Sequence, residues 1–181
     1  MKKALPFLIL AFLFLGISFS FFQTKKSQED LDLSSLKREI DQLIKETIIL
    51  ASQLVNQKEL MEKNNDLIWQ LVNEGNEKNS LLQEKILILT EKLKELIKNL
   101  KKISSKEKRE KLSLALEEEI EALNFLINFS KNFAFFKEEL EKEEPKEKKR
   151  VFEKYKDILE NDFSAAQERS QKFLEVLKEI P

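Results

Sequence analysis

The sequence contains no cysteine and no histidine, and only two of its 181 residues are glycine. Without cysteine, the chain cannot form disulfides, use a thiol nucleophile or carry the lipid of a bacterial lipoprotein. Without histidine, it lacks the commonest general base and the usual zinc ligands. Gly16 and Gly75 alone cannot form a phosphate-binding loop or a dinucleotide fingerprint. We therefore expect no enzymatic activity and no cofactor.

Acidic residues are abundant, but they do not form a metal-binding signature. Glu117 and Glu121 are four residues apart and would share one face of a helix. A di-iron helical bundle normally also needs Glu-x-x-His pairs, which are impossible in a chain without histidine. We expect no metal site, and no small-molecule substrate is indicated.

The scarcity of glycine and proline, together with 36% charged residues, favours long helices over strands and tight turns. The sequence predicts an all-α protein: an N-terminal transmembrane or signal helix, then coiled-coil helices, then a C-terminal antiparallel helical hairpin or bundle. Removing the four lysines before Ser27 from the 32 basic residues leaves 28, against 33 acidic residues. This acidic balance lacks the basic surface that nucleic-acid binding requires, so we expect no nucleic acid as a partner.

A run of uncharged residues lies near the N-terminus. Ala4 to Phe22 are nineteen residues, flanked by lysines on both sides. As a helix they would extend roughly 28 Å, about the thickness of the hydrocarbon core of a bilayer. We interpret 1–26 as a signal anchor that contacts membrane lipid. The residues expected to form this anchor are Ala4, Leu5, Phe7, Leu8, Phe12, Phe14, Ile17 and Phe22.

A cleaved secretory signal is the alternative for this segment, because Ser18 and Ser20 are small residues that suit a cleavage site. Phe21 and Phe22 extend the apolar run beyond the usual length of a signal core, which favours an uncleaved anchor. The lysines at its start favour a cytoplasmic N-terminus. We therefore expect a single-pass protein of the cell membrane with its C-terminal part extracytoplasmic, or, after cleavage, a secreted or periplasmic protein.

Residues 27–104 show a coiled-coil pattern. Apolar residues recur at alternating steps of three and four in two runs that are out of register with each other. We expect a break near 74–80, with Gly75 ending one helix and Ser80 capping the next; one helix that unwinds locally is the alternative. The expected association surface comprises Leu33, Leu36, Ile40, Leu43, Leu82, Ile86, Leu89, Leu93, Leu96 and Leu100.

Residues 105–181 are predicted to form a helical hairpin with its turn at Pro145, a residue well suited to open a helix. Folding there would bring Phe136 near Phe152 and Phe129 near Leu159. These stripes have the spacing of a bundle core, and a groove for apolar segments is the alternative. The residues concerned are Phe129, Phe133, Phe136, Phe152, Tyr155 and Leu159.

These patterns together indicate a membrane-anchored extracytoplasmic coiled-coil protein. We expect it to act as a structural or interaction scaffold at the cell envelope, with a protein partner or as a homo-oligomer. The alternative is a secreted soluble helical binding protein of the chaperone-like (holdase) type.

Overall fold

The computed structural model describes residues 33–103, 105–144 and 147–180. Four long helices contain most of them: α2 (Leu33–Lys63), α3 (Ile68–Asn99), α4 (Lys106–Lys142) and α5 (Lys148–Glu179). Two short 3₁₀ helices, η2 (Asn65–Leu67) and η3 (Leu100–Lys102), lie at the connections. These residues include no β-strand, so the all-α prediction is confirmed for this part of the chain.

The predicted anchor at 1–26 lies outside the described residues. Within the helices that the structure does describe, none combines the length and the apolar character needed to cross a bilayer.

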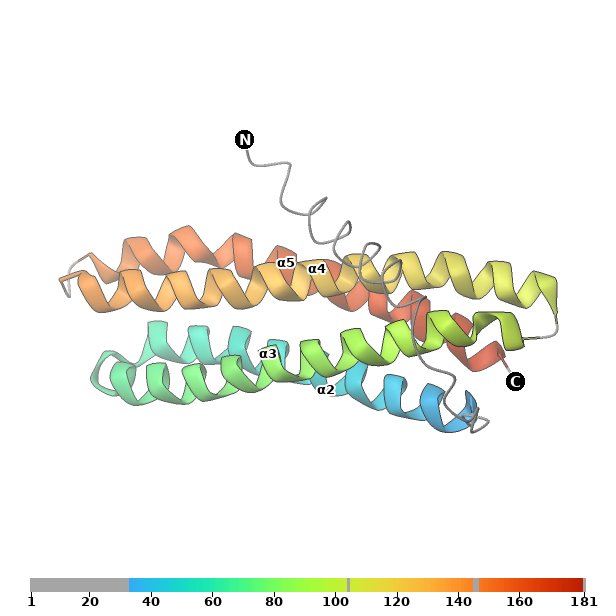
Figure 1. Cartoon of the computed structure of the whole chain (residues 1–181). Coiled ribbons are helices and arrows are strands. Elements are labelled where there is room, and N and C mark those ends of the chain that lie inside the picture. The colour runs from blue at the N-terminus through green and yellow to red at the C-terminus, as the bar shows by residue number, and fades with distance from the viewer. Residues whose placement is uncertain (1–32, 104, 145–146, 181) are drawn as a thin grey trace, which may run out of the picture. The chain divides into compact units, whose positions relative to one another are not determined.

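The four helices form an antiparallel bundle in which each helix lies beside the next one in the chain, and α5 returns to lie beside α2 (Figure 1). The pairs α2–α3 and α4–α5 pack most extensively. The bundle therefore consists of two helical hairpins, which meet along the α3–α4 and α2–α5 interfaces. Helices α2 and α3 form the first hairpin, within the region predicted as a coiled coil, and α4 and α5 form the second.

The break expected at 74–80 is wrong, because α3 continues through Gly75 and Ser80. Gly75 is buried in the bundle rather than placed at a turn. A Cβ atom added there would lie 2.9 Å from Cζ of Phe133 and 3.3 Å from Cε of Met61. The absent side chain thus lets a phenylalanine of α4 approach the backbone of α3. We infer that this packing offsets the roughly 1 kcal/mol that glycine costs inside a helix.

The chain instead turns ten residues earlier, after α2. Asn64 makes the turn: its side-chain Nδ2 donates a hydrogen bond to the carbonyl of Leu60 at 2.9 Å, and its own carbonyl accepts one from the backbone N–H of Leu67 at 3.1 Å. Asparagine and aspartate favour such turns because their side chains bond the neighbouring backbone. The local sequence Asn64–Asp66 was therefore the better stop signal.

The second hairpin follows the predicted bounds closely. Ser105 caps α4, and its hydroxyl accepts a hydrogen bond from the backbone N–H of Lys108 at 3.3 Å. The helix ends at Lys142, and α5 begins at Lys148. The turn therefore falls between these two residues; Pro145 itself lies outside the described residues.

Candidate functional site

The residues expected to form an association surface lie inside the bundle. Most of them are buried, and Leu33 and Leu100 are partly buried against the same core. The apolar stripes of α2 and α3 face the second hairpin of the same chain, so the folded bundle does not offer them to a partner. The expected association surface is thus corrected to an intrachain core. The buried members are Leu36, Ile40, Leu43, Leu82, Ile86, Leu89, Leu93 and Leu96.

The aromatic stripes also form core. The rings of Phe136 and Phe152 meet with their centroids 5.3 Å apart, as the predicted hairpin required, and the ring of Tyr155 lies 5.8 Å from Phe136. Phe129, Phe133 and Leu159 are buried as well, so all six residues are enclosed. Edge-to-face aromatic pairs of this kind add about 0.5–1.5 kcal/mol each beyond their burial. The groove interpretation of these residues is therefore wrong.

A carboxyl group lies in the interior between α4 and α5. Glu119 is 0% exposed, and neither of its side-chain oxygens makes a hydrogen bond of good geometry. Burial raises the pKa of Glu119 to about 8, and the nearby Ser170 hydroxyl offsets only part of that rise. Burial therefore favours the protonated, uncharged form of the Glu119 carboxyl. The Oγ atom of Ser170 is buried and likewise lacks a well-formed hydrogen bond.

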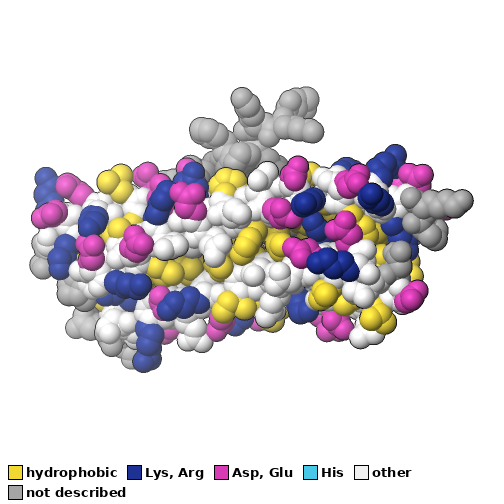
Figure 2. All heavy atoms as spheres, turned by 180° about the vertical axis from the view of Figure 1, so that it is seen from behind, with side chains coloured by type: hydrophobic (Ala, Val, Ile, Leu, Met, Phe, Trp, Pro, Cys, Tyr) yellow, Lys and Arg dark blue, Asp and Glu magenta, His cyan; other side chains and the backbone are white. Residues whose placement is uncertain are grey.

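A groove of about 360 Å³ lies between α2 and α5, and we call it the α2–α5 groove. Figure 2 views this side of the bundle and shows hydrophobic side chains gathered along its middle between charged margins. Ser170 is among the lining residues, but its Oγ atom is buried beneath the groove beside Glu119. The lining residues are Ile44, Lys45, Ile48, Ile49, Gln167, Ser170, Gln171, Leu174, Glu175 and Lys178.

A second apolar surface lies on the outer side of the first hairpin. Lys85 Nζ is 2.8 Å from Glu46 Oε2, so these two residues lie side by side across the α2–α3 interface. Leu81 and Ile88 lie one turn on either side of Lys85, and Ile49 lies one turn after Glu46. These three apolar side chains are 41%, 38% and 54% exposed. We call Ile49, Leu81 and Ile88 the α2–α3 patch.

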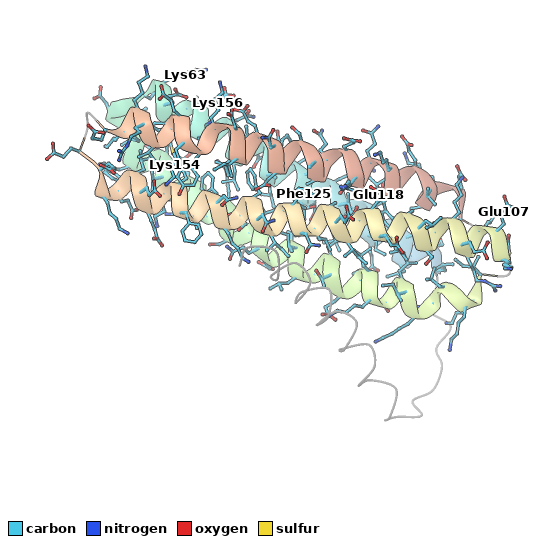
Figure 3. The ribbon with its side chains drawn as sticks, turned by 90° about the horizontal axis from the view of Figure 1, so that it is seen from above. Lys63, Glu107, Glu118, Phe125, Lys154 and Lys156 are labelled. Atoms are coloured by element: carbon cyan, nitrogen blue, oxygen red, sulfur yellow. The ribbon has the colours of Figure 1, made fainter. Side chains whose placement is uncertain are left out.

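Two acidic residues of α4, Glu118 and Glu121, form ion pairs with Arg169 of α5. Arg169 Nη1 lies 2.7 Å from carboxylate oxygens of both Glu118 and Glu121, and its guanidinium carbon is 5.8 Å from the centroid of the Phe125 ring. Figure 3 shows Glu118 and Phe125 on the same stretch of α4, beside α5. Glu121 is thus paired across the hairpin. Across the described ranges, no group of three or more acidic side chains is arranged to hold a metal ion.

Three other buried polar residues, Lys58, Asn79 and Ser130, take part in contacts between the two hairpins. Lys58 is 1% exposed, and its Nζ atom lies 3.6 Å from Glu160 Oε1 across the α2–α5 interface. Across the α3–α4 interface, Asn79 Nδ2 donates to the carbonyl of Ser130 at 3.2 Å, and Gln83 Nε2 donates to the Ser130 hydroxyl at 2.9 Å. These contacts join the two hairpins and set their register.

Sequence reasoning missed Glu119, Ser170 and the α2–α5 groove. A signal for Glu119 was present, since it occupies the position between Leu116 and Leu123 in an apolar stripe of α4. Its acidic neighbours Glu117, Glu118 and Glu121 are more exposed, and they make this buried position hard to recognise in the sequence. No local pattern could have indicated the groove, because its walls come from helices far apart in the chain.

Comparisons of the chain with protein-family models, with curated proteins and with solved structures found no match in any of the three.

Proposed function

We propose that this protein is a non-catalytic interaction scaffold that is tethered to a membrane by residues 4–22 and presents the described bundle on the extracytoplasmic side. The nineteen-residue apolar run and its flanking lysines support the tether. The long apolar stripes of the bundle are buried within one chain, so the bundle is a rigid unit. Such a unit suits a protein that holds other proteins in place or sets the distance between them.

The observation that carries this proposal is the α2–α3 patch. Leu81 and Ile88 remain exposed although neighbouring leucines of α3 are fully buried. The ion pair between Lys85 and Glu46 lies among the apolar side chains of the patch. An apolar cluster with a central polar pair resembles a small protein interface, in which burial supplies affinity and charge supplies register. The chemistry fits a partner surface with its own apolar stripe.

Site-specific photo-crosslinking tests this proposal. A photoreactive amino acid is placed at Leu81 in the full chain, expressed in membranes of its native host. We expect discrete adducts of higher mass from this position. The same probe at Leu114 is the control, because Leu114 is 66% exposed on α4 and lies outside the patch. Ile88→Glu should abolish the adducts from Leu81 by placing a charge in the interface.

Equal amounts of adduct from Leu81 and Leu114, or no adduct from either, would contradict the proposal that a partner binds the α2–α3 patch. The tether is tested separately by the intact mass of the protein in membrane and soluble fractions. Full-length protein in the membrane fraction is expected. Soluble protein that has lost its first twenty or so residues would instead favour the secreted binding protein. The holdase form of that alternative has little support, because Phe129, Phe133 and Phe136 are buried.

A further inference from the structure

The outer side of the first hairpin carries charges in an ordered pattern around the α2–α3 patch. Lys85 Nζ of α3 lies 2.8 Å from Glu46 Oε2 of α2. About two turns away, Lys92 Nζ of α3 lies 2.6 Å from Glu39 Oε2 of α2. In both ion pairs the carboxylate belongs to α2 and the ammonium group to α3. Along the line where the two helices meet, α2 therefore presents an acidic inner row and α3 a basic inner row.

A second pair of rows lies further out and has the opposite signs. On α2, Arg38 and Lys45 immediately precede the two carboxylates of the inner row. On α3, Glu84 and Glu91 immediately precede the two lysines. Successive residues of a helix are rotated by about 100°, and all four of these side chains are exposed, so they point away from the second hairpin. The outer row of α2 is therefore basic, and the outer row of α3 is acidic.

These four rows make the surface complementary to itself in one orientation. When two copies meet about a two-fold axis parallel to the helices, α2 of one copy faces α3 of the other at the same height. Each inner and outer row then faces a row of opposite sign. When the axis is perpendicular to the helices, α2 faces α2 and α3 faces α3, so each row meets its own sign. Because facing like charges exclude a wrong arrangement, the pattern selects a second copy in the parallel orientation.

The apolar side chains of the α2–α3 patch fit the same orientation. Ile49 follows Glu46 on α2, and Leu81 precedes Lys85 on α3. Because α2 and α3 are antiparallel (Figure 1), Ile49 and Leu81 lie on the same side of that ion pair. The parallel two-fold axis therefore places Ile49 of one copy opposite Leu81 of the other, and symmetry repeats the contact. The two side chains are 54% and 41% exposed, and their burial would favour association.

We propose that this protein forms a parallel two-fold dimer through the outer face of α2 and α3, with Ile49 packed against Leu81 and the charged rows setting the register. The inference rests on the proposed function, because it names the partner that the α2–α3 patch binds. Both α2 helices then begin at the same end of the dimer, as two chains tethered to one membrane require. The tether also raises the effective concentration of the second copy, which offsets the weakness of a small interface.

Cysteine crosslinking tests the dimer and its direction, because the chain has no cysteine of its own. Full chains with Ile49→Cys and differently tagged full chains with Leu81→Cys are mixed, reconstituted in phosphatidylcholine vesicles and oxidised. We expect a disulfide-linked dimer that contains both tags. Either variant alone should lose this product, because cysteines on the same helix lie across the axis, at least about 8–10 Å apart, and a disulfide needs Cβ atoms within about 4.5 Å.

The matched control replaces Leu81→Cys with Leu87→Cys. Leu87 is 68% exposed on the same helix but lies outside the α2–α3 patch. Mixed with Ile49→Cys, this control should give no dimer that contains both tags.

Charge exchange between chains separates the dimer from the ion pair within each chain. Glu46→Lys in both cysteine variants should reduce the mixed dimer by at least about tenfold, because it places a lysine opposite Lys85. The dimer should return when Glu46→Lys is kept in the Ile49→Cys chain and Lys85→Glu takes its place in the Leu81→Cys chain. The ion pair within each chain is broken in that mixture, so recovery can come only from contacts between chains. Circular dichroism should show that each variant remains helical.

Several outcomes would overturn this dimer. Equal disulfide formation by Ile49→Cys alone and by the mixture would exclude the parallel orientation. No mixed dimer from folded chains, or a mixed dimer that Glu46→Lys does not reduce, would exclude association through this surface. Photo-adducts from Leu81 that join this chain to a different protein would support the interaction scaffold and overturn its self-association. The absence of both photo-adducts and mixed dimer would overturn the two proposals together.

Discussion

Gly75 of α3 and Phe133 of α4 pack so closely that a Cβ atom on the glycine would lie 2.9 Å from the phenylalanine ring. Phe133 is 1% exposed and its ring lies 5.9 Å from that of Phe136, so it has little room to withdraw. We expect Gly75→Ala to lower the free energy of unfolding by about 1–3 kcal/mol, the usual cost of overpacking a core. Urea unfolding followed by circular dichroism measures it.

The sign of this effect is decisive. At an exposed helical position the same substitution would raise stability by up to about 1 kcal/mol, because alanine has the higher helix propensity. Ser80→Ala, at an exposed position of the same helix, is a reference for helix propensity alone and should stabilise by a smaller amount, about 0.5 kcal/mol, because serine forms helices better than glycine. A stabilising effect of Gly75→Ala would show that α4 does not approach α3 at this point.

Stability should fall as the pH rises from about 4.5 to 8 because of Glu119. Its pKa rises from 4.5 to about 8 in the folded protein, so between these values the folded chain holds a proton that the unfolded chain has lost. Within this range, the contribution of Glu119 lowers the free energy of unfolding by about 1.4 kcal/mol for each unit by which the pH rises. Glu119→Gln removes this dependence and should exceed the wild type at pH 8 by on the order of 4 kcal/mol.

Urea unfolding at pH 5 and pH 8 measures this difference. Glu117→Gln is the matched control, because Glu117 is exposed on the same helix, and it should follow the wild type at both pH values. Comparing variants at each pH cancels the contributions of the surface carboxyl groups. Parallel curves for Glu119→Gln and the wild type would mean that the carboxyl is hydrated in solution.

Phe133 and Phe135 provide a neighbouring pair of buried and exposed aromatic residues. Phe133 is 1% exposed and Phe135 is 55% exposed. We expect Phe133→Ala to lower the free energy of unfolding by about 3–5 kcal/mol and Phe135→Ala to change it by less than about 0.5 kcal/mol. Chemical denaturation distinguishes them. Similar losses for both would place the core on a different face of α4.

Leu89 and Leu87 test whether the predicted association surface is core. Leu89 is 0% exposed, whereas Leu87 is 68% exposed. Leu89→Glu buries an unpaired charge and should unfold the bundle, which appears as lost helical signal in circular dichroism. Leu87→Glu should keep its helicity. If Leu89→Glu stayed folded but lost mass in sedimentation, the α3 stripe would belong to an interface between chains after all.

The sequence predicted the helices and their apolar faces well, because the three-to-four spacing is set by helix geometry. It did not reveal that the stripes of Leu36 and Leu89 are buried by the same chain, since an apolar stripe looks alike whether its partner is internal or external. The predicted helix end at Gly75 was wrong because glycine is typical both of helix ends and of places where two helices pack closely. The candidate site escaped detection for a related reason: Ser170 and Ile48 are adjacent only after the hairpins meet.

Contacts within each hairpin join residues that are closer in sequence than most residues that meet across the interfaces between the hairpins. Helices α2 and α3, like α4 and α5, contact residues joined by short turns, whereas α2 meets α5 across nearly the whole described chain. Closing that last interface costs the most chain entropy, and it packs less extensively than either hairpin. Hydrogen exchange should therefore reveal two cooperative units that part first between α2 and α5. Such opening would expose the apolar faces of both hairpins to solvent without unfolding either one.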